Sequence, residues 1–122
     1  MTPSAKKSAY RFGLLAELLC CWRLRLTGYR ILHRGYRAST GEIDIIARRG
    51  NTLAFIEVKA RNSIADSMHA LQPRQRRRIE RTALVFIGAH SDLESLDFRF
   101  DLMAVTPWRI PAHLTAAWMM DE

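Results

Sequence analysis

Two neighbouring segments, 42–47 and 53–60, constrain the fold most, because each places charged residues at alternate positions among large apolar ones. The first reads Glu-Ile-Asp-Ile-Ile-Ala and the second reads Leu-Ala-Phe-Ile-Glu-Val-Lys-Ala. Alternation of this kind is typical of β-strands, in which every second side chain points to the same face. The five residues between the segments, Arg-Arg-Gly-Asn-Thr, suit a hairpin loop. The sequence therefore predicts an antiparallel hairpin over residues 42–60.

The predicted hairpin brings three charged side chains together. Asp44 points away from Ile43 and Ile45, which we expect on one common face, and Glu57 shares a face with Lys59. Pairing of the two strands then places Asp44 next to both Glu57 and Lys59. A carboxylate that loses its water needs a counter-charge or a metal ion. The hairpin thus predicts a compact charged site flanked by core residues.

Two carboxylates with a nearby lysine suit the hydrolysis of a phosphodiester. Asp44 and Glu57 would hold a hard cation, Mg²⁺ or Mn²⁺, which polarises the phosphate and lowers the pKa of a bound water. Lys59 would orient or help deprotonate that water, or neutralise charge in the transition state. An isolated Glu-Val-Lys is more often an exposed strand edge with an ion pair. The combination of both segments favours the site.

The remaining elements complete an α/β domain. Apolar residues at three- and four-residue steps predict an amphipathic helix from about Ala9 to Leu26, and a second helix follows Pro73 and ends at Gly88. The apolar positions of the first helix are Phe12, Leu15, Ala16, Leu19, Trp22 and Leu26, and those of the second are Ile79, Ala83, Phe86 and Ile87. Residues 29–32 and 97–105 read as strands.

Other stretches show no clear period. Residues 33–41 read as a loop or irregular strand, 62–71 as a mobile loop, and 91–96 as a polar linker, whereas the tail after Pro107 has no assignment. The 122 residues suit one domain, which we place at 9–122 after a flexible N-terminus at 1–8. The predicted order is α-β-β-β-α-β.

Cysteine usage and hydropathy favour a cytoplasmic protein without a membrane anchor. Cys20 and Cys21 are adjacent within an apolar run, which favours two buried reduced thiols over a metal site or a disulfide. No signal-peptide pattern follows Lys6 and Lys7, and the apolar run 14–22 is too short to span a bilayer.

The positive charge is concentrated in one half of the chain. The net charge is +7 and the isoelectric point is near 10.2. Residues 1–62 hold 12 Lys and Arg against 4 Asp and Glu, a net charge of +8, whereas residues 63–122 hold 7 against 8. A surplus of this kind favours nucleic acid as a partner, and DNA in particular once a phosphodiesterase site is considered.

A dense run of arginines follows Pro73. Five arginines oppose a single Glu80 within eight residues, and at helical spacing four of them, all but Arg76, line one side. Such a run is more often a solvated face than a ligand surface. Beside a phosphodiesterase site it would contact phosphate oxygens without reading bases. The candidate nucleic-acid contacts are Arg74, Arg76, Arg77, Arg78 and Arg81, with Arg34, Arg37, Arg48 and Arg49 as the next set.

Several short stretches together resemble a known family. They are Gly28-Tyr29-Arg30-Ile31-Leu32, Gly41-Glu42-Ile43-Asp44, Phe55 to Lys59, Gln75 with the arginines after it, and Phe100-Asp101. The chain is similar over residues 10–105 to the YraN-like family of small bacterial proteins, regarded as predicted endonucleases related to archaeal Holliday-junction resolvases. The family is placed in the restriction-endonuclease-like superfamily, whose core is a mixed β-sheet flanked by helices.

The resemblance implies roles for particular residues. It implies that Asp44, Glu57 and Lys59 form the catalytic set, joined by an acid from the first helix at the position of Glu17. Ile43 stands where many restriction enzymes have a proline, which weakens any inference to sequence-specific cleavage. Resolvases of this class act as dimers, so a homodimer is implied by analogy only.

Three polar residues near the site keep two interpretations each. Glu17 is as well explained by a helix-surface pair with an arginine as by a metal-ligand role. Glu42 either supports the ligands or is exposed at the strand start. Gln75 either hydrogen-bonds near Glu57 and Lys59 or is half exposed in the first helical turn. The four histidines have no ligand-like spacing and read as surface or core residues.

The leading hypothesis is a divalent-metal-dependent endonuclease acting on DNA, including branched or damaged structures. The alternatives are a non-catalytic nucleic-acid-binding module that retains the nuclease fold and an accessory protein whose basic face docks on an acidic partner. The intact set of Asp44, Glu57 and Lys59 favours the enzyme over the binding module. No acidic-partner feature supports the third alternative.

Overall fold

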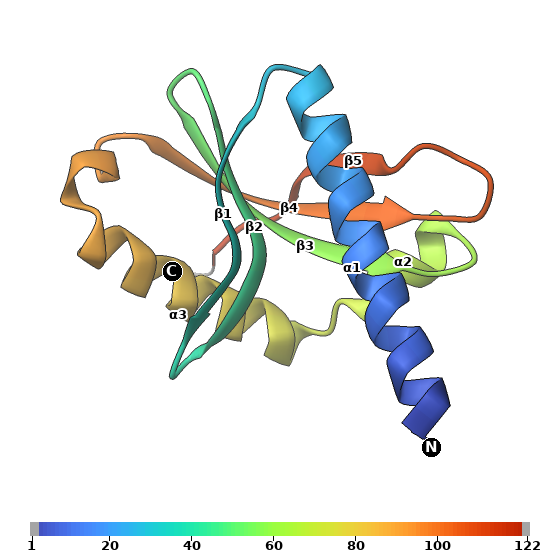
Figure 1. The fold of residues 1–122 in the computed structure, drawn as a ribbon. Coiled ribbons are helices and arrows are strands. Elements are labelled where there is room, and N and C mark those ends of the chain that lie inside the picture. Colours follow the sequence, from blue (N-terminus) through green and yellow to red (C-terminus); the bar gives the residue numbers. More distant parts are fainter. Residues whose placement is uncertain (1–2, 121–122) are drawn as a thin grey trace.

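A computed structural model describes the backbone of residues 3–120 and the side chains of residues 12–120. The chain folds as an α/β domain, as predicted (Figure 1). The elements are α1 (Pro3–Leu26), β1 (Arg30–Ala38), β2 (Gly41–Arg49), β3 (Thr52–Ala60), α2 (Ile64–Ala70), α3 (Pro73–Ala89), a 3₁₀ turn η1 (Ser91–Leu93), β4 (Asp97–Val105) and β5 (Ala112–Trp118).

The five strands form one mixed sheet in the order β1-β2-β3-β4-β5. Neighbouring strands are antiparallel except β3 and β4, which are parallel. A parallel pair needs a crossover connection, and α2 and α3 supply it. In the predicted hairpin Ile45 pairs with Ile56, and β3 then pairs with β4 through Glu57 and Leu102. The expected mixed sheet flanked by helices is confirmed.

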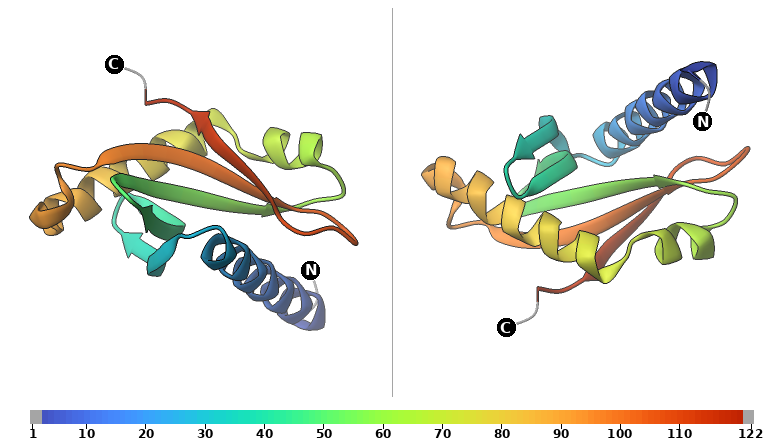
Figure 2. Two further views of the ribbon diagram at one scale, coloured as in Figure 1. Left: turned by 90° about the horizontal axis from the view of Figure 1, so that it is seen from above. Right: turned by 90° about the horizontal axis from the view of Figure 1, so that it is seen from below.

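Helices cover both faces of the sheet. Figure 2 shows α1 on one face and α2 and α3 on the other. The predicted core face of α3 is confirmed, because Ile79, Ala83 and Phe86 are buried against the sheet and Ile87 packs beside them. On the opposite face, buried residues of α1 pack against a separate cluster that includes Ile56 and Met103. The two apolar layers hold the hairpin of β2 and β3 between them.

The buried side of α1 differs from the predicted apolar stripe. Cys20, Cys21 and Leu24 are buried together with Ala16, whereas the other five predicted stripe positions are exposed. The prediction that both cysteines are buried is confirmed. The stripe assignment is wrong because α1 is apolar on two sides and the small side faces the sheet. None of the described helices is both long and apolar enough to cross a membrane.

Several element boundaries differ from the sequence-based predictions. Residues 64–70 form α2 rather than a mobile loop, and Ser63 caps the helix by accepting a hydrogen bond from the Asp66 N–H at 3.0 Å. The irregular segment after residue 32 continues as β1 to Ala38, and the unassigned tail contains β5. The linker over 91–96 includes the turn η1.

The first helix begins at Pro3, earlier than the predicted start near Ala9. Residues 1–2, at the start of the segment predicted to be flexible, lie outside the described residues. Flexibility of residues 1–8 stays a prediction.

A bend in β2 corrects the predicted faces of that strand. Ile43 packs in the cluster under α3, whereas Ile45 packs in the cluster under α1, so these two side chains do not share a face. The change occurs at Asp44, opposite Gly35 of β1, whose φ of 62° is unfavourable for a residue with a side chain. The bend turns the end of β2 away from β3 and opens a fork between them.

Candidate functional site

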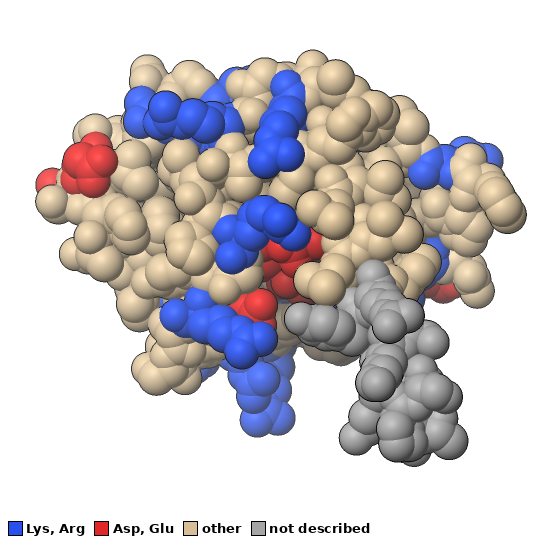
Figure 3. All heavy atoms as spheres, viewed as in Figure 1, with Lys and Arg blue, Asp and Glu red and all other residues tan. Residues whose placement is uncertain are grey.

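An open basin of about 930 Å³ lies where β2 and β3 separate. Its walls come from α1, from the β1–β2 hairpin and from the end of β3. Figure 3 shows acidic side chains at the bottom of this hollow, with Lys and Arg side chains around them. The charged residues that line the basin are Glu17, Arg34, Arg37, Glu42, Asp44, Lys59 and Arg61.

Asp44 occupies the point of the fork. The last paired position of the two strands is Ile45 with Ile56, and beyond it the side chain of Asp44 replaces the backbone as a partner for β3. Its Oδ2 accepts a hydrogen bond from the Val58 N–H at 2.8 Å. A single carboxylate therefore closes the end of the ladder and lines the basin at the same time.

Glu57 and Lys59 meet Asp44 as the alternation of the strand predicts. Glu57 is 6 % exposed, and its Oε1 lies 3.6 Å from Nζ of Lys59. Gln75, in the first turn of α3, donates a hydrogen bond from Nε2 to the same Oε1 at 3.1 Å. Of the two interpretations of Gln75, the hydrogen-bonded one is therefore correct. An amide on α3 and a lysine on β3 fix the orientation of the buried carboxylate.

If both were ionised, the two carboxylates would carry more negative charge than their surroundings balance. Burial and the charge of Asp44 raise the pKa of Glu57 to about 9, although Lys59 acts in the opposite direction. Burial also raises the pKa of Asp44, against the hydrogen bonds from the Val58 N–H and from the side chain of Glu57. The pair must therefore share a proton or bind a cation at neutral pH.

The two other acids of the basin are paired with arginines. Arg34 Nε donates to Oε1 of Glu17 at 3.1 Å, and Arg37 Nε lies 3.3 Å from Oε2 of Glu42. Burial raises the pKa of Glu17, Arg34 lowers it, and the charge of Asp44 raises it further. Within residues 12–120, no three Asp, Glu, His or Cys side chains are grouped closely enough to hold a metal ion together. The structure thus shows the arginine pair of Glu17 rather than a three-acid cluster.

The candidate nucleic-acid contacts divide into three groups. Arg34 and Arg37 line the basin. The side chains of Arg74, Arg77, Arg78 and Arg81 are exposed along one side of α3, as their spacing predicts, whereas Arg76 is half-buried. Arg48 binds the carbonyl of Gly50 and Arg49 binds the carbonyl of Thr27, both away from the basin. Arg78 packs near Gly41 at the start of β2, but none of the α3 arginines lines the basin.

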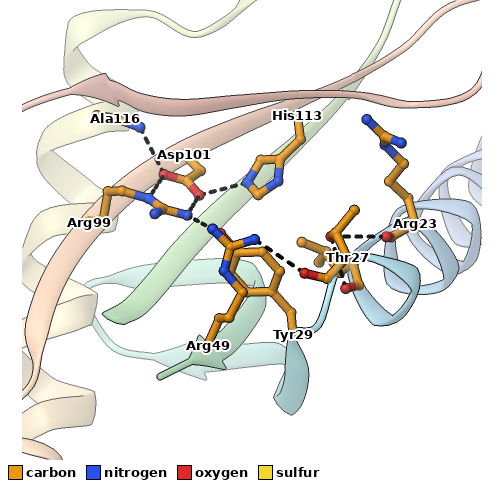
Figure 4. Close-up of polar contacts among 9 residues, drawn as sticks. Arg23, Thr27, Tyr29, Arg49, Arg99, Asp101, His113 and Ala116 are labelled. Atoms are coloured by element: carbon orange, nitrogen blue, oxygen red, sulfur yellow. Dashed lines mark hydrogen bonds and ion pairs between the residues drawn. The ribbon is translucent and has the colours of Figure 1, made fainter. Parts of the chain in front are cut away.

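A second buried carboxylate, Asp101 of β4, lies on the α1 face of the sheet in a polar cluster (Figure 4). Asp101 is fully buried and accepts two hydrogen bonds from Arg99, each of 2.8 Å, and one from Nε2 of His113 at 2.7 Å. The Ala116 N–H donates to the same carboxylate at 3.0 Å. Arg99 also donates to the hydroxyl of Tyr29. Asp101 therefore ties β5 and the start of β1 to the centre of the sheet.

The charge of Asp101 is balanced. Burial raises the pKa of this carboxyl, but the hydrogen bonds from His113, Arg99 and the Ala116 N–H outweigh burial and leave the pKa below its usual value. The hydrogen bonds to Asp101 also raise the pKa of Arg99.

The sequence identified Asp101 only as part of a motif, and it predicted His113 to be a surface or core residue without ligand-like spacing. The signal for the pair was the acid at the centre of an apolar strand, which requires a partner. Its partner lies on β5, which was not predicted because Pro107 and Pro111 precede that strand.

Comparison with known proteins places the chain in a family. The sequence model of the uncharacterised protein family UPF0102 matches residues 16–105. The chain is 43 % identical over 121 residues to a UPF0102 protein of Paramagnetospirillum magneticum, with 96 % of this chain and 94 % of the relative covered. It is 46 % identical over 116 residues to a UPF0102 protein of Parvibaculum lavamentivorans, with 95 % and 87 % covered. It is also 46 % identical over 117 residues to one of Mesorhizobium japonicum, with 95 % and 94 % covered.

Proposed function

The chain belongs to the UPF0102 family, in agreement with the predicted YraN-like resemblance, and we propose that it is a divalent-metal-dependent endonuclease that hydrolyses phosphodiester bonds in DNA. The observation that carries this proposal is the carboxylate pair of Asp44 and Glu57, whose negative charge exceeds the compensation from Lys59. The same basin is surrounded by arginines that fit a phosphate backbone. The relation to restriction-endonuclease-like enzymes and to Holliday-junction resolvases is part of the proposal.

The residues present fit a magnesium or manganese ion. Oxygen ligands are what these hard cations prefer, and Mg²⁺ is commonly held by one or two carboxylates with several waters. A bound cation also removes the repulsion that raises the pKa of Glu57. We therefore assign Asp44 and Glu57 as the ligands, and the ion would polarise the phosphate and supply a nucleophilic water at neutral pH. Glu17 joins them only if it leaves Arg34.

The other residues of the site orient the ligands and the substrate and neutralise negative charge. Lys59 holds a positive charge next to the carboxylates, where it stabilises the extra negative charge of the phosphorane-like transition state. Gln75 keeps Glu57 in a single orientation through the hydrogen bond from α3. Arg34 and Arg37, on the wall of the basin, are placed to contact the phosphates next to the scissile one.

The exposed arginines of α3 extend the binding surface. Because arginine contacts to phosphate oxygens read no bases, the affinity for DNA would depend little on sequence and would fall steeply with salt. Such a surface suits recognition by shape, and branched or damaged DNA is the substrate class that we propose.

A second candidate function is favoured by one observation. Glu17 is engaged by Arg34, and the described residues hold no three-acid metal cluster. A protein in which only two acids of the site are free of an arginine partner could bind nucleic acid without cleaving it. The two functions differ in a single measurable respect, which is turnover in the presence of a divalent ion.

The deciding experiment is single-turnover cleavage with enzyme in excess. The substrates are single-stranded, duplex, flap and four-way-junction DNA, each with Mg²⁺ and with Mn²⁺. Lys59→Met keeps the aliphatic stem, so it should lower the cleavage rate roughly 10²–10³-fold while DNA affinity changes little. Asp44→Asn should abolish cleavage through lost metal affinity. Arg109→Met removes one positive charge outside the basin and serves as the matched control.

The outcomes separate the candidates. Cleavage that is lost in Asp44→Asn prepared in the same way excludes a contaminating nuclease. If the wild type binds the panel and cleaves none of it, the binding module is correct. If Lys59→Met cleaves as fast as wild type, the protein is a nuclease whose active site lies elsewhere.

A further inference from the structure

The outer face of α1 carries a row of large apolar side chains that the domain does not cover. Phe12 is 55 % exposed, Leu15 53 %, Leu19 38 %, Trp22 51 % and Leu26 65 %. The domain buries the opposite side of the helix, through Ala16, Cys20, Cys21 and Leu24. A monomeric protein rarely leaves so continuous an apolar surface in water.

The spacing of this row is that of a helix-packing seam. The five positions follow one another by three, four, three and four residues, which is the a and d pattern of a coiled coil. A seam with this period accommodates the knobs of another helix. The row therefore indicates a helix as its partner.

A loop forms the other wall of an apolar groove along the row. The groove has a volume of about 840 Å³, with Phe12, Leu15, Leu19 and Trp22 on one side and the β4–β5 loop on the other. The loop contributes Pro107, Trp108, Ile110 and Pro111. Trp108 is fully exposed and holds a φ of 63°, so the loop presents a tryptophan to solvent at a backbone conformation that L-residues seldom adopt.

We propose that this chain forms a two-fold symmetric dimer in which α1 of each copy packs along the groove between α1 and the β4–β5 loop of the other. A two-fold interface requires one self-complementary surface. This surface is self-complementary because it contains a helix with an apolar row and, beside it, a groove in which a second copy of that helix can lie. The groove shares Phe12, Ala60 and Arg61 with the rim of the basin but is not lined by Asp44 or Glu57, and the proposal does not depend on nuclease activity.

The exposed area is sufficient for a stable pair. The five α1 residues with Trp108 and Ile110 expose on the order of 800 Å² of apolar surface, taking about 150–250 Å² for each fully exposed large side chain. A standard protein–protein interface takes about 800 Å² from each partner.

The proposed pair is antiparallel, with the two-fold axis crossing the seam. α1 is basic at both ends, with Lys6, Lys7 and Arg11 near its start and Arg23 and Arg25 near its end. Either orientation therefore brings like charges together, and the antiparallel one rests on the position of the seam and not on charge. The antiparallel pair places Leu19, the middle residue of the row, close to its own copy at the two-fold axis.

The groove fits a protein better than nucleic acid. Arg61 and Arg109 are the two basic residues in its lining, and the rest is mainly apolar. A phosphate backbone needs cations along its path, and the exposed arginines of α3 offer them on the opposite face of the sheet.

Sedimentation equilibrium over protein concentrations from about 1 to about 100 µM tests the dimer. Wild type should be a dimer in this range, and Leu19→Glu should raise the dimer dissociation constant at least roughly 100-fold, because two buried charges of like sign would face each other. Leu84→Glu, on the exposed side of α3, is the matched control and should leave the dimer intact. Far-ultraviolet circular dichroism reports whether each variant folds.

A second pair of variants keeps the test valid if Leu19→Glu fails to fold. Trp108→Ala, in the loop, should raise the dissociation constant roughly tenfold or more, as truncation of a central aromatic does. Leu19→Cys should form an intermolecular disulfide on mild oxidation, and Met68→Cys on α2 should not.

Three outcomes would overturn the proposal. They are a monomeric wild type at every concentration, a Trp108→Ala variant that dimerises as well as wild type, and a monomer that binds vesicles of phosphatidylglycerol and phosphatidylcholine through the α1 row. The last outcome would make the row a membrane-surface helix instead.

Discussion

Asp44 and Asp101 occupy similar positions in the sheet and have opposite electrostatic surroundings. Each carboxylate accepts a backbone N–H where a ladder is interrupted, from Val58 at 2.8 Å and from Ala116 at 3.0 Å. Arg99 and His113 lie beside Asp101 and lower its pKa. Asp44 lies instead beside a second carboxylate, Glu57, and the pKa values of both acids are raised.

This contrast distinguishes a structural carboxylate from a candidate reactive one. A buried charge that is fully paired holds strands together and leaves no requirement for a ligand. A buried pair of like charges lowers stability and persists in a chain when a proton, a metal ion or a substrate completes it. Both clusters lie on one sheet, so the paired and the unpaired carboxylate can be compared within the same fold.

The largest expected effect concerns Asp101. Asp101→Ala should lower the free energy of unfolding by about 3–5 kcal/mol, because it leaves Arg99, His113 and the Ala116 N–H without their common partner. Chemical denaturation measures the change. Asp97→Ala, an exposed aspartate at the start of the same strand, is the control and should cost less than about 0.5 kcal/mol. A small effect of Asp101→Ala would remove the structural half of the contrast.

The second effect is the pH dependence of Glu57. The pKa of Glu57 is 4.5 in an unperturbed chain and about 9 in the fold, so the folded protein binds more protons between these values. Stability contributed by this group is therefore lost as the pH rises from about 5 to about 9. Against Glu57→Gln, wild type should lose on the order of 2 kcal/mol over this range, because local relaxation and water entry reduce the full cost.

The opposite sign is expected for Asp101. Its folded pKa is lowered, so its stabilisation is present above the usual aspartate value of 3.8 and is lost as the pH falls through the folded pKa.

The pH dependence that we expect for Glu57 is measured by denaturation curves of wild type and Glu57→Gln at about pH 5, 7 and 9, values set by the titration window. If the free energies of unfolding of wild type and Glu57→Gln change in parallel with pH, the pKa of Glu57 is not raised in the fold.

The third effect is stabilisation by metal. At about ten times its dissociation constant, Mg²⁺ should add about 1.4 kcal/mol to the free energy of unfolding of wild type. Asp44→Asn should show no such gain, and Asp66→Asn, exposed on α2, should behave as wild type. Thermal unfolding with and without Mg²⁺ measures the shift. An equal shift in wild type and Asp44→Asn would place the ion elsewhere.

The smallest effect concerns Tyr29. Tyr29→Phe removes the hydroxyl that accepts from Arg99 and should cost about 1 kcal/mol. The ring stays, so its contacts with Arg49 and His113 persist. Tyr36→Phe on β1 controls for loss of a tyrosine hydroxyl. A cost near that of Asp101→Ala would show that Tyr29 holds the whole cluster.

The candidate site was predictable because it lies within one hairpin. The alternation in 42–47 and 53–60 and a short turn were sufficient to bring Asp44, Glu57 and Lys59 together. The bend of β2 was not predictable, since the alternation of residues 42–47 gives no sign of it and it lies opposite Gly35 in a different strand. For Glu17, the sequence left two interpretations open; the structure shows the ion pair with Arg34, and the role of Glu17 as a metal ligand stays a prediction.

The sequence by itself determined α3, the two hairpin strands and their local chemistry. The periods of α3 and of the two hairpin strands, the isolation of carboxylates in apolar strands and the excess of arginine all follow from short-range patterns that the backbone geometry imposes. These patterns are independent of the rest of the chain, and each was visible before any packing was known.

Only the tertiary structure decided which surfaces meet. α1 has two apolar sides, and the side with Ala16, Cys20, Cys21 and Leu24 packs on the sheet whereas the row from Phe12 to Leu26 stays exposed. Asp101 is hydrogen-bonded to His113 across the β4–β5 pair, and no local sequence pattern predicted that pairing. Burial of a face is a competition among all elements for the same core, so it is settled by the assembled fold and not by any one segment.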